Sequence, residues 1–363
     1  MPQTRQIALA VAIAAVAGSG AFLAVSPPAV TSAAVVPAIG GTLRAAGADP
    51  AASPAPAPAA SEAVVAVSVA EVWSGRHKVR SFDLPALQRP AHITAWLRRM
   101  TFHQRSHLYQ RLATQVRYGE QVDVLDAWGS LTQIRIPDQT GGRFPDGIIG
   151  WVASEQLAPE PADWTAPTQV ATVTAKLATL HRVVGGADHP IDVSYATTLP
   201  VLAVHPHVVV VAVPGPVDRA TLSRAAVRVH RLGTPAIRPN RHDVLAQARR
   251  FLGLPYLWAG MSAWGYDCSG LTSTIYSQLG ITLPRDAADQ SLVGKPVPRN
   301  RLRPGDLVFF SHTPQRGDIH HVAIYAGRGR VLQSPYTGSR VEIVKLRHSY
   351  LNREYWGASR PLP

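Results

Sequence analysis

Cys268 is the only cysteine among the 363 residues, and its setting points to chemistry. A single thiol cannot form an internal disulfide, and it excludes a zinc site built on several cysteines. The apolar residues Leu271, Ile275 and Leu279 recur at helical spacing, which predicts a helix that begins at Cys268 and is ended by Gly280. A thiol at a helix N-terminus ionises more easily, and the thiolate is the nucleophilic form.

Asp267, directly before the thiol, has the opposite effect, because an adjacent carboxylate raises the pKa of a thiol. Activation of Cys268 must therefore come largely from a histidine, and Asp267 must have another role. One such role is to cap the helix through a side-chain oxygen.

The sequence HHVAIY, which starts at His320, supplies the histidine. Strand alternation places His321, Ala323 and Tyr325 on one face and His320 on the other, so only one of the two histidines can face the thiol. We expect His320 to be structural or exposed. Gln333 lies between apolar strand residues, where a polar side chain needs a partner. Its carbonyl could accept a hydrogen bond from His321 and so orient the ring.

The chain is basic, with 36 Lys and Arg against 23 Asp and Glu and a formal net charge of +13. Such a charge favours anionic partners such as nucleic acid, acidic membranes or cell-wall polymers. No nucleic-acid-binding motif is present and the basic residues are dispersed, so we expect adhesion to a polyanionic surface and no nucleic-acid partner. No motif for a metal or a soluble cofactor is evident either.

The N-terminus has the anatomy of a signal peptide. Arg5 precedes an apolar stretch over residues 7–25, and Ser32 with the two alanines after it forms a small-residue cleavage region. We therefore predict a signal peptide over 1–34 and a secreted or cell-wall-associated protein, with an uncleaved membrane anchor as the alternative. Residues 35–62 are rich in Ala and Pro and read as an extended linker.

Three folded segments follow the linker. The first, 63–164, combines two predicted helices with a run of short strands, and the second, 165–238, is again rich in strands. Predicted helices cover 91–100 and 103–113, and predicted strands cover 122–124, 131–136, 150–152, 191–195, 199–204, 208–213 and 226–230. The two segments are either two small β domains with a weak internal repeat or one irregular β domain.

The third segment, 239–363, places helices before strands and is predicted to be an α+β domain. A first helix should open at Asp243 and stop at Gly253. The helix of Cys268 comes next, and the strands are predicted at 306–310, 321–325, 331–333 and 341–344.

Five blocks of this segment come in the order and spacing of a known family: PYLWAG at 255–260, DCSGL at 267–271, LPR at 283–285, RPGDLVFF at 303–310 and HVAIY at 321–325. The segment 242–358 thus resembles the NlpC-type cell-wall cysteine peptidases. The resemblance implies a papain-like fold in which Cys268 is the nucleophile, His321 the base and Gln333 the orienting third residue. Gln333 is a departure, since histidine often occupies that position.

The resemblance also implies a substrate. Tyr256 matches a tyrosine that lines the active site, and Asp267 with Ser269 match positions that hold a free amino terminus in one subgroup. That subgroup, the γ-D-glutamyl-L-diamino-acid endopeptidases, carries two SH3-like domains before the catalytic domain, and the segment from Gly119 to Val152 resembles such a module. Its first SH3-like domain supplies an acidic contact, for which Glu120 is the candidate by position.

We therefore expect a monomeric enzyme, without metal or cofactor, that cleaves the amide between γ-D-glutamate and meso-diaminopimelate in peptidoglycan stem peptides with a free N-terminal L-alanine. The alternatives are a broader D,L-endopeptidase on intact crosslinked peptidoglycan and a cell-wall-binding protein without activity.

Overall fold

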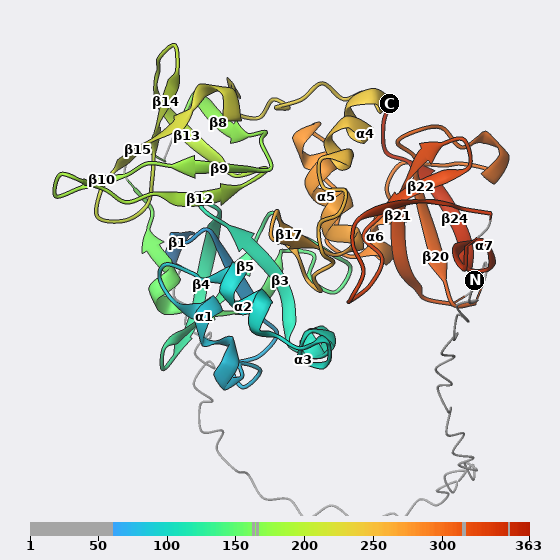
Figure 1. Ribbon diagram of the computed structural model, residues 1–363, viewed down its shortest axis with the longest axis horizontal. Helices are drawn as coiled ribbons and strands as arrows, with labels where there is room; N and C mark the ends of the chain where they lie inside the picture. The colour runs from blue at the N-terminus through green and yellow to red at the C-terminus, as the bar shows by residue number, and fades with distance from the viewer. Residues whose placement is uncertain (1–60, 162–163, 165–166, 314–316, 348) are drawn as a thin grey trace, which may run out of the picture. The chain divides into compact units, whose positions relative to one another are not determined.

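The computed structural model describes residues 61–363 except 162–163, 165–166, 314–316 and 348 (Figure 1). The predicted signal peptide and nearly all of the predicted linker lie outside the described residues. Ser61 and Glu62, placed at the end of the linker by the sequence, instead begin a strand that pairs with Val124 and Asp123. Among the described residues, none of the helices combines the length and the apolar character needed to cross a bilayer.

The first folded segment is built on one seven-stranded sheet with the order β3-β2-β6-β5-β4-β1-β7. Its predicted strands at 122–124, 131–136 and 150–152 are confirmed. In β5, the apolar residues Leu131, Ile134 and Ile136 point into the core while Gln133 and Arg135 are only half-buried. The strands are β1 (Ser61–Val65), β2 (Val69–Trp73), β3 (Leu112–Arg117), β4 (Gln121–Trp128), β5 (Leu131–Ile136), β6 (Ile148–Ala153) and β7 (Leu157–Pro159).

A helical insertion separates β2 from β3, and it is shorter than the sequence predicts. It contains α1 (Leu84–Leu87), α2 (Ile93–Arg99), α3 (Phe102–Ser106) and a 3-10 turn, His107–Gln110. The predicted helix over 103–113 is therefore wrong in its second half, because Leu112 already begins β3. That strand pairs with β2, about 40 residues earlier in the chain, and a local pattern cannot reveal such long-range pairing.

The insertion packs against the segment that leads to Cys268. Trp96 of α2 is fully buried and donates from Nε1 to Asp83 at 2.9 Å, and Asp83 is also paired with Arg80 at 2.7 Å. Trp96 shares one apolar cluster with Leu257 and Ala259. The insertion thus has its core in common with the segment that follows Pro255.

The second folded segment is all β in its described part. The strands predicted at 191–195, 199–204, 208–213 and 226–230 are confirmed within about two residues. Five others, β8, β9, β10, β11 and β15, were not predicted. Five strands pair in the order β15-β14-β13-β8-β16 and two more form a β12-β9 pair. The strands are β8 (Gln169–Val173), β9 (Leu177–Leu180), β10 (Val183–Val184), β11 (Ala187–Asp188), β12 (Ile191–Ser194), β13 (Thr198–Val204), β14 (Val208–Ala212), β15 (Arg219–Ser223) and β16 (Val227–Arg231).

The third segment packs helices against an antiparallel sheet of order β19-β24-β20-β21-β22-β23, so the predicted mixture of helices and strands is confirmed. Its helices are α4 (Arg241–Arg249), α5 (Cys268–Gln278), α6 (Ala287–Gln290) and α7 (Leu351–Glu354). Its strands are β17 (Met261–Ser262), β18 (Gly265–Tyr266), β19 (Lys295–Pro296), β20 (Leu307–Ser311), β21 (Ile319–Gly327), β22 (Arg330–Gln333), β23 (Glu342–Lys345) and β24 (Tyr355–Arg360).

The first helix of this segment begins earlier than predicted. Asn240, not Asp243, is its cap: the Asn240 side chain accepts a hydrogen bond from the Asp243 backbone N–H at 2.9 Å. The helix α4 ends at Arg249, before the predicted stop at Gly253.

Helix α5 lies against β21 in the orange and red part of the ribbon (Figure 1). Leu271 and Ile275 of the helix share one buried cluster with Val322 and Ile324 of the strand. Each such side chain contributes about 1.5–3 kcal/mol when fully buried. This packing fixes the N-terminus of α5, and with it Cys268, relative to the strand that carries His321.

A buried polar network joins β3 to the third segment. The Gln115 Oε1 atom accepts from the Met261 N–H and the Ser262 hydroxyl, both at 2.8 Å, while its Nε2 donates to Glu71 at 2.7 Å. Burial raises the pKa of Glu71 to about 8, although the bond from Gln115 acts in the opposite direction. Glu71 is therefore protonated in the folded protein at neutral pH.

We predict that Glu71 makes the protein less stable as the pH rises. Its pKa is about 8 in the folded state against 4.5 as the ordinary value, so the folded state keeps a proton that the unfolded chain releases. Stability should fall between pH 4.5 and 8, by up to about 1.4 kcal/mol per pH unit. Glu71→Gln should flatten this dependence in urea-unfolding measurements at pH 5 and pH 8. The exposed Glu62→Gln is the control, and an unchanged slope in Glu71→Gln would contradict the prediction.

Candidate active site

Cys268 occupies the first turn of α5, as predicted. Asp267 is the N-cap, and its Oδ1 accepts from the Gly270 backbone N–H at 2.7 Å, so the capping role is confirmed. The backbone N–H groups of Val322 and Ser269 are near enough to the sulfur to lower the pKa of the thiol. The thiol therefore lies beside β21, the strand that carries His321.

The helix can start here only because residue 270 is glycine. A Cβ on Gly270 would lie 2.1 Å from the Gly260 carbonyl oxygen, far inside van der Waals contact. The backbone of the loop before the helix therefore crosses directly over the first turn of α5.

His321 lies buried on β21, with its ring 5.5 Å from that of Phe310. Its Nε2 lies 2.8 Å from Gln333 Oε1, as the sequence predicts. Gln333 in turn donates from Nε2 to Glu342 at 3.0 Å, which fixes its oxygen towards the ring. Nε2 therefore carries the hydrogen, and Nδ1 is left as the basic nitrogen.

Cys268 is half-buried where it lines the cleft, and the surroundings of both groups favour their neutral forms. Burial raises the pKa of the Cys268 thiol to about 12, and Asp267 acts in the same direction. Burial also lowers the pKa of His321 to about 4. Desolvation disfavours the charged form of each group and outweighs the helix N-terminus.

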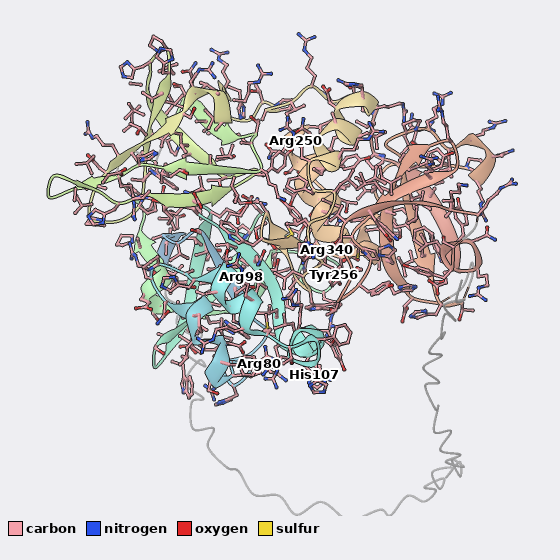
Figure 2. All side chains as sticks on the ribbon, viewed as in Figure 1. Arg80, Arg98, His107, Arg250, Tyr256 and Arg340 are labelled. Atoms are coloured by element: carbon pink, nitrogen blue, oxygen red, sulfur yellow. The ribbon has the colours of Figure 1, made fainter. Side chains whose placement is uncertain are left out.

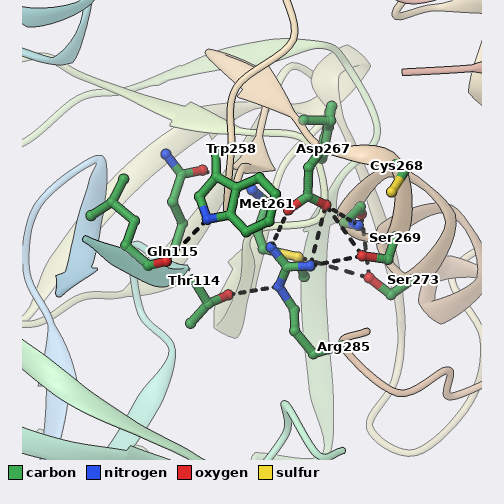
Figure 3. A network of polar contacts seen from close by, with 12 residues as sticks. Thr114, Gln115, Trp258, Met261, Asp267, Cys268, Ser269, Ser273 and Arg285 are labelled. Carbon is green, nitrogen blue, oxygen red and sulfur yellow. Dashed lines mark hydrogen bonds and ion pairs between the residues drawn. The ribbon is translucent and has the colours of Figure 1, made fainter. Parts of the chain in front are cut away.

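Arg285 is the residue that sequence reasoning missed. Its buried guanidinium makes a bidentate pair with Asp267, at 2.6 Å from Nη2 and 3.2 Å from Nη1 (Figure 3). It also donates to Ser269 Oγ at 3.0 Å and to Thr114 of β3 at 2.9 Å. The only signal in the sequence was its place in the LPR block of the resemblance.

A cleft of about 730 Å³ opens beside the thiol. One wall comes from the helical insertion, where Tyr109 packs edge-on against Trp258 at 6.2 Å and the Trp258 indole donates to the Leu112 carbonyl at 3.2 Å. Trp258 therefore faces the cleft. The residues that line it include Ser106, Tyr109, Ala113, Tyr256, Trp258, Asp267, Cys268, Ser269, Arg285, His320 and Tyr336.

The predicted residues Tyr256, Asp267 and Ser269 thus share this cleft with Cys268. Burial raises the pKa of Tyr256 well above its ordinary value, so its hydroxyl stays protonated. Figure 2 marks Tyr256 together with Arg98 of the insertion, and both line a second, smaller cavity of about 240 Å³.

Glu120 does not join the cleft. It forms an ion pair with Arg117 and lines a separate cavity of about 390 Å³. The structure therefore gives no support to Glu120 as the acidic contact.

A thiol at a helix N-terminus, packed on an antiparallel sheet that carries a buried imidazole held by a side-chain amide, defines a site of the cysteine-peptidase class. Comparison with known proteins agrees: residues 253–360 match the NlpC/P60 family, and the chain belongs to that family.

Two relatives match most of the chain. It is 36% identical over 307 residues to the gamma-D-glutamyl-L-lysine dipeptidyl-peptidase of Bacillus cereus (strain ATCC 10987 / NRS 248), covering 84% of this chain and 92% of the relative. It is 35% identical over 299 residues to the protein of the same name from Bacillus subtilis (strain 168), covering 81% and 96%. The crystal structure of an NlpC/P60 family protein from Bacillus cereus ATCC 10987 superposes with a TM-score of 0.80 at 34% identity, covering 84% of this chain and all of that one.

The neutral resting state predicts how the thiol reacts. With a pKa raised to about 12, the thiolate fraction of Cys268 should grow about tenfold per pH unit, and so should the rate of alkylation by iodoacetamide between pH 6 and 9. Mass spectrometry of the intact protein measures this rate cleanly, because there is only one cysteine, and Cys268→Ser gives the background. A rate that is already maximal at pH 6 would reveal a preformed thiolate–imidazolium pair and contradict the prediction.

The Asp267–Arg285 pair predicts a large asymmetry between single and double variants. Arg285→Met leaves a buried carboxylate without its partner and should cost about 3–5 kcal/mol in the free energy of urea unfolding. In Asp267→Asn/Arg285→Met the amide can still cap α5 and no charge is stranded, so part of the stability should return. The exposed Arg228→Met serves as the control. Equal stability of the single and double variants would contradict the assignment of Arg285 as the partner that neutralises Asp267.

Proposed function

We propose that the protein is a cysteine peptidase of peptidoglycan stem peptides that hydrolyses the amide between γ-D-glutamate and an L-diamino acid. The observation that carries the proposal is a thiol at the N-terminus of α5, a helix packed against β21, the strand whose buried imidazole is held by Gln333 at 2.8 Å. The names of the two long relatives favour the same bond, with L-lysine as the diamino acid.

In the proposed mechanism His321 acts as general base. Its Nδ1 takes the proton of the Cys268 thiol as the sulfur attacks the γ-carbonyl carbon of D-glutamate. The C–N bond breaks, the imidazolium protonates the leaving amine, and a thioester remains. Water, deprotonated by His321, then cleaves the thioester and releases the acid.

The helix N-terminus serves the transition state in this mechanism. The backbone N–H of Cys268 is a donor for the oxyanion, because the first amides of a helix have no intrahelical partner. Gln333 is a neutral partner for the imidazolium, and a cysteine nucleophile needs less stabilisation of that cation than serine does.

The amino terminus of the substrate is proposed to bind at Asp267, Ser269 and Tyr256. Arg285 already occupies one edge of the Asp267 carboxylate, so an ammonium group can use only the remaining lone pair of Oδ2. The Ser269 hydroxyl and the Tyr256 hydroxyl are the neighbouring polar groups in the cleft. The wall formed by Tyr109 and Trp258 narrows the cleft and favours a short peptide over intact crosslinked peptidoglycan.

We further propose the domain layout 63–164, 165–238 and 239–363, with the two β-rich segments as SH3-like modules ahead of a papain-like catalytic domain. The separate sheets of the first two segments support this layout, with seven strands in the first and five in the main sheet of the second. The net charge of +13 and the apolar N-terminal stretch favour an exported, wall-associated protein, either secreted after signal cleavage or held by an uncleaved anchor.

The test uses L-Ala-γ-D-Glu-L-Lys and L-Ala-γ-D-Glu-meso-diaminopimelate, each free and N-acetylated, with products identified by mass spectrometry. We expect release of L-Ala-D-Glu from the free peptides, complete loss in Cys268→Ala, and a rate at least about tenfold lower for the acetylated peptides, since each lost charge contact costs 1.4 kcal/mol or more. The ratio of the two free substrates identifies the preferred diamino acid.

Three outcomes would overturn all or part of this proposal. Equal release by Cys268→Ala would remove the thiol from the mechanism. Equal cleavage of free and acetylated peptides would remove the amine-binding role of Asp267 and favour a broader D,L-endopeptidase. Binding of peptidoglycan without any cleavage would indicate a cell-wall-binding protein.

A further inference from the structure

Three potential metal ligands lie close together beside the cleft, at one end of the sheet. His312 follows β20, His320 is the second residue of β21, and Glu354 directly precedes β24. These strands are neighbours in the sheet: Ser311 pairs with Ile319, and Phe310 pairs with Tyr355. Neighbouring antiparallel strands begin and end at the same ends of a sheet. The fold itself therefore brings the three side chains together.

The ligand atoms are close enough for one ion. His320 Nε2 lies 3.3 Å from Glu354 Oε2, and His312 Nδ1 lies 3.9 Å from Glu354 Oε1. The two imidazole rings stack 3.9 Å apart, and one ligand atom from each residue lies within 4.8 Å of the others. Zinc bonds of about 2.1 Å place tetrahedral ligands about 3.4 Å apart. To close the site, the exposed His312 ring must leave the stack with His320 and turn its lone pair towards the ion.

The Glu354 carboxylate lacks a full set of hydrogen bonds to the described residues. Glu354 Oε2 is buried and makes no hydrogen bond of good geometry, a costly state for a carboxylate. His312 is 80% exposed, so its side chain is free to turn towards an ion. A cation would stabilise this partly buried carboxylate, which lies between two imidazoles.

We propose that His312, His320 and Glu354 form a binding site for a zinc ion at the rim of the active-site cleft. Two imidazoles and one carboxylate suit borderline transition metals, whereas calcium and magnesium prefer sets of oxygen ligands. Three protein ligands leave a fourth position for water or for a substrate group.

The site is coupled to the cleft through His320. That residue lines the cleft, and its ring lies 6.3 Å from the ring of His321 on the same strand. An ion held there would lie at the rim of the cleft that contains Cys268 and would obstruct the substrate, and so zinc should slow the peptidase. The proposed zinc site does not depend on the proposed function, whereas the predicted inhibition does.

Zinc binding is measured by isothermal titration calorimetry on protein without an affinity tag, in the Cys268→Ala background so that the thiol cannot bind the metal. We expect one zinc ion per chain in the micromolar range and no binding of calcium or magnesium. His312→Ala and Glu354→Gln should each weaken zinc binding by about tenfold or more. His103→Ala is the matched control, because His103 and His107 form the other close histidine pair, with rings 4.1 Å apart and no carboxylate between them.

The proposal is overturned if zinc does not bind at these concentrations, if only protein with Cys268 binds it, or if His103→Ala weakens binding while His312→Ala does not. The inhibition is tested separately with the wild-type cysteine. Zinc should lower the rate of wild-type protein at least tenfold at saturation and leave His312→Ala much less affected. Zinc binding without inhibition would overturn only the proposed obstruction of the cleft, and an inactive protein that binds zinc would overturn only the proposed function.

Discussion

The ion pair between Asp267 and Arg285 is the interaction on which the rest of the site depends. Asp267 caps α5 through Gly270 and thereby fixes the first turn that carries Cys268. Arg285 neutralises that carboxylate, donates to Ser269 and reaches across to Thr114 of β3. One buried cation thus ties the nucleophile helix, the cleft floor and the first β-rich segment together (Figure 3).

The contact with β3 explains why the β-rich segment belongs to the site. Gln115, next to Thr114 on that strand, binds Met261 and Ser262 shortly before the nucleophile. The helical insertion beside β3 then supplies Tyr109 as a wall of the cleft. A change in the first segment can therefore alter the active site without touching Cys268, since the two share a buried polar network and an apolar cluster.

The sequence predicted those features that local rules determine. The helix of Cys268 follows from apolar spacing and an aspartate cap, and the His321–Gln333 contact follows from strand alternation and the needs of a buried amide. Arg285 could not be assigned from such rules, because it approaches Asp267 from a loop 18 residues away and has no periodic pattern around it. Leu112 was assigned to a helix because its pairing with Trp73 is a long-range contact.

The sequence also did not reveal how deeply Cys268 and His321 are buried, and burial decides the charge state of the site. The Asp267 carboxylate favours the imidazolium of His321 and disfavours the thiolate of Cys268, while Arg285 favours the thiolate. The two charges thus act in opposite directions on the pKa of the thiol, Asp267 more strongly than Arg285, and desolvation is the largest influence. On the proposed binding mode, the ammonium group of the substrate adds a second cation beside Asp267. That charge lowers the pKa of the thiol when substrate is present, so a free amino terminus would serve both recognition and activation of the nucleophile.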